Sequence, residues 1–374
     1  MTQLPPAPPA SHFLAQAGPH ATAAKEPFLF LYITEKCQLR CTHCYMGRQR
    51  LDAERRMTPA QVEQILATLR VAYGQYKVYL LGGEPTTHPQ FDEILTVCKT
   101  QGYKVVLTSN GLIAPKVWPA LDGRLDSFSF SMDGAHQATH EAMRGPGTWR
   151  PLLTSMARAV NAGFQTRAIM TVTTANRTDV FDAIDLAETT GLEMLSLHYF
   201  TPTGIGADKP HLQIPPPEWM ELCEQIRQAA AGRRVRVFYP PAFATPDQLP
   251  ALRAAGYGGC TARNLERLAI FPDGRVYICS AFFDTDLHYG VIRDGAIHPR
   301  LTNQGINELT LVNKISTNCL SCSHSSTCGG GCAAYDHLGK TLASSDCDRT
   351  TIPVCPLWST PAEQSTEKRL VDLR

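Results

Sequence analysis

Long apolar runs and an excess of charge of either sign are missing from this chain of 374 residues. No run approaches the ~18 apolar residues that a membrane-spanning helix needs, so we expect no membrane segment. The formal net charge is +1, which gives no electrostatic reason for nucleic acid or an anionic membrane to be the main partner. The first residues also lack the basic and apolar segments of a secretory signal.

Cysteine, in contrast, is abundant, with 13 residues. Without a secretory signal, so many thiols indicate metal binding in a reducing compartment rather than disulfide bonds. We therefore expect a cytoplasmic protein. The apolar fraction of 43% is enough for a substantial core, and the length suits one large domain with a smaller one.

Strand-like and helix-like segments alternate after residues 1–26, which are rich in Pro and Ala and predict a disordered tail. One helix start is well marked, with Thr58 as N-cap, Pro59 in the first turn and Gln61 completing a capping box. Such alternation predicts a parallel sheet with helices outside it. The predicted strands cover residues 28–33, 77–81, 103–108, 126–131, 167–172 and 194–200.

Three cysteines, Cys37, Cys41 and Cys44, follow the first predicted strand at spacing C-x3-C-x2-C. Three thiolates on one loop can hold three irons of a four-iron, four-sulfur cluster, which normally takes four cysteines. The fourth iron then keeps an open coordination site for a small chelating ligand. Half of a zinc site and a disulfide framework are the alternatives, although zinc ribbons favour C-x2-C pairs. His43, inside the loop, is expected to be a spacer.

Polar turns end the next predicted strands. Gly82 and Gly83 allow a ligand to come close to the backbone, and Glu84 can accept a hydrogen bond from an ammonium group. The third strand ends at Thr108-Ser109-Asn110-Gly111 and the fourth at Ser131-Met132-Asp133-Gly134. In parallel α/β sheets, ligand sites lie at the carboxyl ends of the strands, where the cysteine loop also lies.

Outside these turns, two other cysteines and the basic residues are explained more simply by packing or solvation than by catalysis. Cys98 and Cys223 lie on apolar helical faces, where cysteine behaves as a small hydrophobic residue. The basic segment at residues 48–56 predicts a solvated loop or, alternatively, a contact for an acidic substrate.

A second group of cysteines occupies the last third of the chain. Eight cysteines can supply two sets of four ligands, either for two iron–sulfur clusters or for two zinc ions, and spacing does not separate these alternatives. Its members are Cys260, Cys279, Cys319, Cys322, Cys328, Cys332, Cys347 and Cys355.

The cysteine loop, the Gly82-Gly83-Glu84-Pro85 turn and the C-terminal cysteines together resemble the radical S-adenosylmethionine (radical SAM) superfamily with a C-terminal SPASM domain, as in peptide and sulfatase maturases. The resemblance spans about residues 28–358. It implies an α/β fold, with a partial (β/α)6 TIM-like barrel followed by a small cysteine-rich domain. The implied boundaries are 27–205 for the barrel, 206–255 for a bridging region, 256–360 for the SPASM domain and 361–374 for a C-terminal tail.

The resemblance also implies S-adenosylmethionine and three [4Fe-4S] clusters, a radical-generating one on Cys37, Cys41 and Cys44 and two auxiliary ones. By position, the first auxiliary cluster would take Cys260, Cys279 and Cys332, and the second Cys319, Cys322 and Cys328. How Cys347 and Cys355 complete these sets stays open, as does an open iron in the first auxiliary cluster. The family's cofactor contacts fall on Tyr45, Gly82, Gly83, Glu84, Pro85, Asn110, Ser131 and Asp133. Candidates for a general acid or base, by position alone, are Asp133, Arg144, His198 and Tyr199.

The implied activity is that of an oxidoreductase that cleaves S-adenosylmethionine to a 5′-deoxyadenosyl radical, which abstracts hydrogen from the substrate. The main hypothesis is a peptide substrate that is cross-linked, converted to a thioether or oxidised on a side chain. The alternative is oxidation or epimerisation of a sugar or aminocyclitol, and a zinc-dependent binding scaffold is a hypothesis of another class. Expected partners are the substrate, an electron donor such as flavodoxin or ferredoxin, and, as a further candidate, a separate leader-peptide-binding protein.

Overall fold

The computed structural model of the chain describes residues 28–73, 77–240, 242–250, 267–283, 285, 288–293, 296–299, 332 and 352–353. The two predicted tails, 1–26 and 361–374, lie outside the described residues. So do six cysteines of the C-terminal group, which are Cys260, Cys319, Cys322, Cys328, Cys347 and Cys355.

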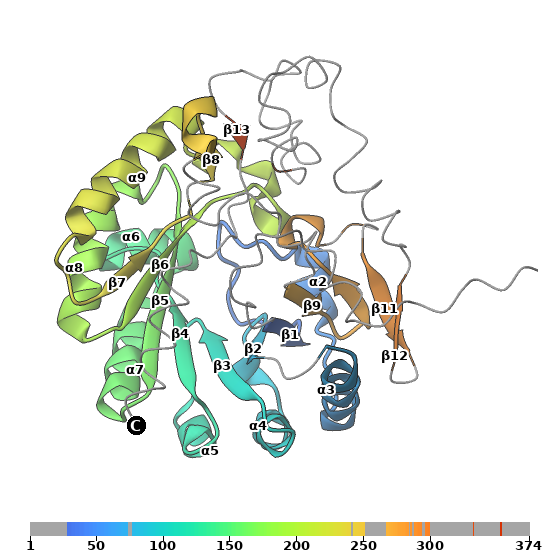
Figure 1. Cartoon of the computed structure of the whole chain (residues 1–374). Helices are drawn as coiled ribbons and strands as arrows, with labels where there is room; N and C mark the ends of the chain where they lie inside the picture. The colour runs from blue at the N-terminus through green and yellow to red at the C-terminus, as the bar shows by residue number, and fades with distance from the viewer. Residues whose placement is uncertain are drawn as a thin grey trace, which may run out of the picture.

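A parallel sheet, curved into a partial barrel with helices around its outside, forms the centre of the molecule (Figure 1). Its first six strands pair in sequence order, each parallel to the next. The predicted α/β barrel is therefore confirmed, and each predicted strand is found within two residues of its expected ends. The strands are β1 Phe28–Thr34, β2 Lys77–Gly82, β3 Lys104–Ser109, β4 Ser127–Ser131, β5 Gln165–Val172 and β6 Met194–Tyr199.

The helices begin and end where local chemistry predicts. At the start of α3, the Thr58 N–H donates to Gln61 Oε1 at 2.7 Å and the Gln61 N–H donates to Thr58 Oγ1 at 3.2 Å, so the capping box is confirmed. Gly191 ends α8 with a φ of 81°, a conformation that glycine adopts at little cost. The helices are α2 Arg48–Ala53, α3 Pro59–Tyr73, α4 Phe91–Thr100, α5 Trp118–Leu121, α6 Gln137–Arg144, α7 Trp149–Asn161, α8 Val180–Thr190 and α9 Pro216–Ala230.

The two faces of the sheet differ in character. Side chains that face the helices are buried and apolar: Phe128 on β4 lies 5.6 Å from the ring of Trp118 on α5, and Leu29 and Leu31 on β1 are fully buried. Because side chains alternate along a strand, the residues between them face the barrel interior. Ser129 and Ser131 on β4 do so. The interior face of β4 is therefore polar, while the hydrophobic core lies between sheet and helices.

Strands from later in the chain extend both edges of the barrel. β7, Arg236–Phe238, pairs parallel with β6, and β9, Arg267–Ile270, pairs parallel with β1. Described strands of the predicted bridging and SPASM regions thus share one sheet with the barrel, while the domain boundaries themselves stay predictions. The other strands are the antiparallel β10 Arg275–Tyr277, β11 Gly290–Arg293 and β12 Ala296–Pro299, and the separate pair β8 Phe243–Ala244 and β13 Ile352–Pro353.

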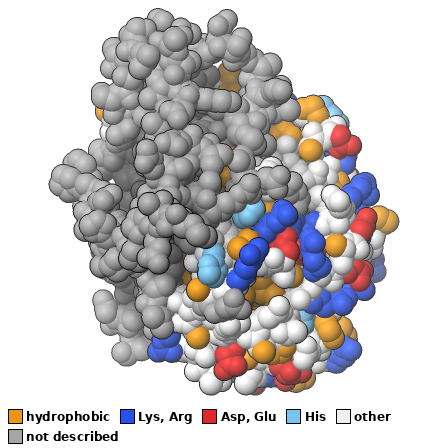
Figure 2. All heavy atoms as spheres, turned by 90° about the vertical axis from the view of Figure 1, so that its right-hand side faces the viewer, with side chains coloured by type: hydrophobic (Ala, Val, Ile, Leu, Met, Phe, Trp, Pro, Cys, Tyr) orange, Lys and Arg blue, Asp and Glu red, His pale blue; other side chains and the backbone are white. Residues whose placement is uncertain are grey.

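Helices of the described part of the chain are all too short or too polar to cross a membrane. On the face shown in Figure 2, acidic and basic side chains are intermixed over the described surface. This distribution agrees with the net charge of +1.

Candidate active site

The three predicted cluster ligands lie on the loop after β1, at the carboxyl edge of the sheet. Cys37, Cys41 and Cys44 are free thiols, and N–H groups from separate elements face their sulfurs. The Leu39 N–H lies 3.4 Å from Cys37 Sγ, and Asn110 Nδ2, in the loop after β3, lies 3.9 Å from the same atom. Such donors stabilise a thiolate more than a thiol.

Burial raises the pKa of the Cys37 and Cys44 thiols to about 12 each. These thiols are therefore protonated at neutral pH without a metal, and metal binding must displace their protons. Among the described residues, no three His, Cys, Asp or Glu side chains converge on a single metal ion. A four-iron cluster needs no such convergence, because each thiolate binds a different iron. The donor set therefore fits an iron–sulfur cluster better than one ion.

Gly82 and Gly83 bring the loop after β2 against the cysteine loop. A Cβ on Gly82 would lie 2.1 Å from the carbonyl oxygen of Thr34, and one on Gly83 would lie 2.2 Å from that of Lys36. The Gly83 N–H donates to Thr34 O at 2.9 Å. In the structure, the close approach that these glycines permit is that of the cysteine loop itself.

The Glu84 carboxylate, which is 1% exposed, joins the loops after β2 and β3. Its Oε1 accepts hydrogen bonds from Thr86 Oγ1 at 2.7 Å and Ser109 Oγ at 3.0 Å, and its Oε2 accepts one from the Asn110 N–H at 2.8 Å. Burial raises the pKa of Glu84, and these hydrogen bonds oppose the rise. Pro85, which is buried, follows at once. A contact of Glu84 with an ammonium group stays a prediction.

Asp133, fully buried after β4, accepts three hydrogen bonds from three other elements. The donors are Arg144 Nε at 2.5 Å, His43 Nε2 at 3.0 Å and the Thr171 N–H at 2.7 Å. Burial opposes ionisation of Asp133, but the charge of Arg144, and then His43, lowers its pKa well below the ordinary value. Arg144 also points NH1 at Cys41 Sγ, at 3.9 Å. This Asp133 cluster (Asp133, Arg144, His43 and Thr171) therefore fixes the cysteine loop to the sheet.

His43 was expected to be a spacer, and that expectation is wrong. Its ring is 8% exposed, its Nε2 binds Asp133, and its Nδ1 is buried with no hydrogen-bond partner among the described residues. A single sequence offers no signal for this contact, because His43 and Asp133 meet through the fold. The predicted roles of Asp133 and Arg144 as acid or base stay predictions, but both groups already have charged partners.

His140 on α6 accepts a hydrogen bond from the backbone of the same aspartate. It is fully buried, and its Nδ1 accepts the Asp133 N–H at 3.3 Å. Burial lowers the pKa of His140 to about 4, with the nearby Arg144 adding to the effect. The ring is therefore neutral at neutral pH.

His198 and Tyr199 lie on opposite faces of β6, although both were expected at the mouth of the site. Tyr199 faces outward: its hydroxyl donates to the Ile214 carbonyl at 2.7 Å and its ring lies 5.0 Å from that of Trp219. Tyr199 therefore lies outside the candidate site, as the alternation along a strand requires. His198 faces inward, and burial lowers its pKa to about 4.

Tyr45, next to Cys44, packs into an aromatic cluster that reaches the C-terminal strands. Its hydroxyl lies 3.1 Å from that of Tyr32, and its ring centroid is 5.8 Å from Phe283. Tyr32 in turn stacks on Phe271 at 4.1 Å. A contact between Tyr45 and adenine stays a prediction.

Arg50 forms neither a solvated loop nor a free substrate contact, so both expectations for this basic segment are wrong for this residue, whereas Arg55 is exposed. Arg50 is buried, donates to Glu35 Oε1 at 2.7 Å and lies 4.2 Å above the ring of Phe271. Arg55 Nε donates to Glu35 Oε2 at 2.7 Å. Glu35, fully buried just before the cysteine loop, is thereby neutralised within the protein.

The remaining predicted residues lie on the interior face of the sheet or in the hydrophobic core. Ser131 lies half-buried at the end of β4, on the interior face, and Cys98 is fully buried under α4 as predicted. Cys279 and Cys332 are buried in the main hydrophobic cluster.

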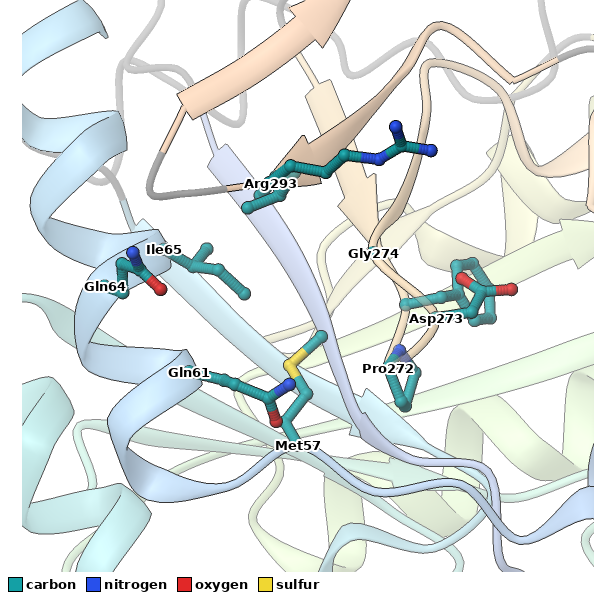
Figure 3. Close-up of a pocket in the computed structure, with 10 residues that line it drawn as sticks. Met57, Gln61, Gln64, Ile65, Pro272, Asp273, Gly274 and Arg293 are labelled. Carbon is teal, nitrogen blue, oxygen red and sulfur yellow. The ribbon is translucent and has the colours of Figure 1, made fainter.

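A cavity of about 250 Å³ lies elsewhere, between α3 and the C-terminal strands, with Gln61 and Arg293 among its lining residues (Figure 3). No predicted site residue lines that cavity.

Comparison with known proteins finds a family model, curated relatives and solved structures that this chain resembles. Residues 31–187 match the family model of the radical SAM superfamily. The mycofactocin maturase MftC of Mycolicibacterium smegmatis is 27% identical over 350 residues, covering 88% of this chain and 83% of that protein.

Two solved structures share the fold. Streptococcus suis SuiB, bound to its precursor peptide SuiA, superimposes with a TM-score of 0.65 at 18% identity, covering 90% of this chain and 77% of that one. The protein anSMEcpe, bound to AdoMet and a peptide, superimposes with a TM-score of 0.61 at 19% identity, covering 92% and 98%.

We expect Gly83→Ala to impair iron binding, because its Cβ would meet the Lys36 carbonyl at 2.2 Å. Overpacking of this kind costs about 1–3 kcal/mol, and the displaced atoms belong to the cysteine loop. The measurement is iron per chain after anaerobic reconstitution, together with the urea unfolding midpoint. Gly123→Ala is the control: φ is +67° there and no atom lies within 4 Å of the added Cβ, so stability falls without loss of iron. Full iron content in Gly83→Ala would contradict the prediction.

We expect stability to fall as the pH is lowered from 7 to 5, partly through His140. Its pKa is about 4 in the folded chain against 6.5 in the unfolded one, so the unfolded chain takes up the proton first. The loss begins near pH 6.5, and by pH 5 it amounts to about 2 kcal/mol. In His140→Asn, which can still accept the Asp133 N–H, urea unfolding at both pH values should show a smaller decrease. The exposed His136→Asn should retain the full decrease; equal decreases in wild type and His140→Asn would refute the assignment.

Proposed function

From the premise that this chain is a radical SAM enzyme, we propose that it modifies a peptide by removing a hydrogen atom from an unactivated C–H bond. The observation that carries the proposal is the cysteine loop itself. Three free thiols follow β1, with N–H donors from the β3 loop and α6 directed at their sulfurs.

In this proposal Cys37, Cys41 and Cys44 hold three irons of the radical-generating cluster. When bound, that cluster would supply one electron to S-adenosylmethionine. Cleavage of the reduced cofactor would give methionine and a 5′-deoxyadenosyl radical, which abstracts hydrogen. The chain's own residues supply position. Glu84 joins the loops after β2 and β3, and the Asp133 cluster holds Cys41 and its loop against the ends of β4 and β5.

We assign the cofactor contacts to the residues around these loops. Their positions support the assignment, because the loops after β1 to β4 lie at one edge of the sheet, next to the cysteines. The assigned residues are Tyr45, Gly82, Gly83, Glu84, Pro85, Asn110, Ser131 and Asp133.

A peptide substrate is supported by the nature of the relatives. MftC is named a maturase, and SuiB and anSMEcpe were solved with peptides. The alternative of a sugar or aminocyclitol has no such support among them. The reaction needs an electron donor, for which flavodoxin or ferredoxin are candidates, and a separate leader-peptide-binding protein is a further candidate partner. A reducing cytoplasm suits the 13 cysteines of the chain.

We further propose two auxiliary [4Fe-4S] clusters on the C-terminal cysteines, which accept or relay the electron that the substrate radical loses. Of the proposed ligands, Cys279 and Cys332 are described, and both are buried in the hydrophobic cluster that also includes Phe283. Phe283 contacts Tyr45, next to Cys44. The segment after Cys279 therefore packs directly on the cysteine loop, which supports a short path between the two groups of cysteines.

We expect Cys41→Ala to abolish 5′-deoxyadenosine formation, because one of the three iron ligands of the radical-generating cluster is lost. The product is measured by chromatography after reduction of the reconstituted enzyme with dithionite in the presence of S-adenosylmethionine. Cys98→Ala is the matched control, since Cys98 is a buried residue of α4 away from the loop. Full product formation by Cys41→Ala would exclude the proposed site.

We expect about twelve irons, with matching acid-labile sulfide, per reconstituted wild-type chain, four for each of three clusters. Replacing Cys37, Cys41 and Cys44 together by Ala should lower the count to about eight, because the auxiliary ligands are untouched. A wild-type count of about four, or a protein that contains zinc instead of iron, would contradict the auxiliary clusters.

A further inference from the structure

Arg267 begins β9 and faces the interior of the barrel. The register of β1 and β9 pairs Arg267 with Phe28 and Ala269 with Phe30. Paired residues of adjacent parallel strands point to the same side of the sheet. Phe28 and Phe30 lie on the side away from the helices, next to Tyr79 of β2. The guanidinium of Arg267 lies 5.3 Å from the centroid of the Phe30 ring, which confirms this orientation.

The Arg267 side chain is a buried cation without an anionic partner among the described residues. The residue is 5% exposed, and its Nε is buried with no hydrogen-bond partner. Its contact with Phe30 is a cation–π contact, which does not neutralise the charge. An unpaired buried charge is costly in free energy. Such a group is therefore expected to have a partner in the functional state of the protein.

The charge of Arg267 acts on ionisable groups on both sides of the barrel interior. Burial raises the pKa of Tyr32 and Tyr45, and Arg267 opposes this rise. Burial lowers the pKa of His198 on β6, and Arg267 adds to that decrease. The guanidinium thus lies inside the barrel beside Phe30, reached from the first residue of β9.

The three buried carboxylates of the candidate site already have hydrogen-bond or ion-pair partners. Asp133 binds Arg144 and His43, Glu84 accepts hydrogen bonds from Thr86, Ser109 and Asn110, and Glu35 binds Arg50 and Arg55. Each carboxylate is buried and held by its own donors. None of them can turn to Arg267 without leaving those donors unpaired, which is costly.

We propose that Arg267 binds a carboxylate of the substrate inside the barrel and holds that part of the substrate below the cysteine loop. The proposal rests on the proposed peptide substrate and names the group by which that substrate is recognised. A guanidinium presents two parallel N–H groups that match the two oxygens of a carboxylate. An unmodified peptide carries carboxylates at two kinds of position, its C-terminus and its Asp or Glu side chains, and both have this chemistry.

The test is equilibrium binding to the reconstituted full-length enzyme with S-adenosylmethionine present, followed by calorimetry at constant ionic strength. Three probes separate the sources: N-acetyl-leucine has a terminal carboxylate, N-acetylglutamate α-amide has a side-chain carboxylate, and N-acetyl-leucine amide has neither. We expect one or both carboxylates to bind the wild type more tightly than the amide does. Arg267→Met should weaken carboxylate binding roughly ten- to a hundredfold, as loss of a charge-assisted hydrogen bond does, and leave the amide unchanged.

Arg158→Met is the matched control. It also removes a guanidinium from above an aromatic ring, that of Trp118 at 4.4 Å, but on the exposed outer side of the barrel. Arg158→Met should bind all three probes as the wild type does. Arg267→Lys, which keeps the charge without the two parallel N–H groups, should have intermediate affinity and provides the test if Arg267→Met does not fold.

Several results would overturn the proposal. These are equal binding of carboxylates and amide by the wild type, undiminished carboxylate binding by Arg267→Met, or loss of iron from Arg267→Met, which would make Arg267 a partner of a cluster instead. The proposed function fails by a different measurement, namely the absence of peptide-dependent 5′-deoxyadenosine formation. Because probe binding requires no turnover, the two failures are distinguishable.

Discussion

The Asp133 carboxylate is the interaction on which the arrangement of the site depends. It is fully buried, and its donors come from the cysteine loop, α6 and β5. A buried carboxylate without donors would be unstable, so each of these elements is held by the need to satisfy the same two oxygens. Arg144 links this requirement to the iron site, because it contacts both Asp133 and the sulfur of Cys41. The position of the cysteine loop therefore depends on the ion pair between Arg144 and Asp133.

Glu84 has the same function two strands earlier, by a different means. Its donors are neutral hydroxyl and backbone groups instead of an arginine. The loops after β1 to β4 are thus joined by two buried carboxylates and by the glycines that let the loops approach each other. Together these contacts fix the carboxyl edge of the sheet.

The strands, the helix caps and the cysteine loop could be predicted because each has a local signal. The capping box at Thr58 and Gln61 is visible in four residues, and the spacing of Cys37, Cys41 and Cys44 is visible in eight. The contact of His43 with Asp133, and the pairing of Arg50 and Arg55 with Glu35, depend on tertiary structure and have no local signal. Tyr199 was placed wrongly for a simpler reason: a strand puts neighbouring side chains on opposite faces. The pairing of β9 with β1 was also beyond prediction, because such long-range contacts leave no pattern in either strand.

That pairing has a consequence for how the protein is made. β1 is among the first strands to be synthesised, yet one of its edges is paired by β9, which is synthesised much later. Until then β1 presents unpaired backbone groups and the Phe28 and Phe30 rings, the kind of edge that promotes aggregation. Tyr32 and Arg50 also lack Phe271 and Asp273, the neighbours that support them in the folded chain. Cells that produce this protein are therefore expected to need chaperones during its translation.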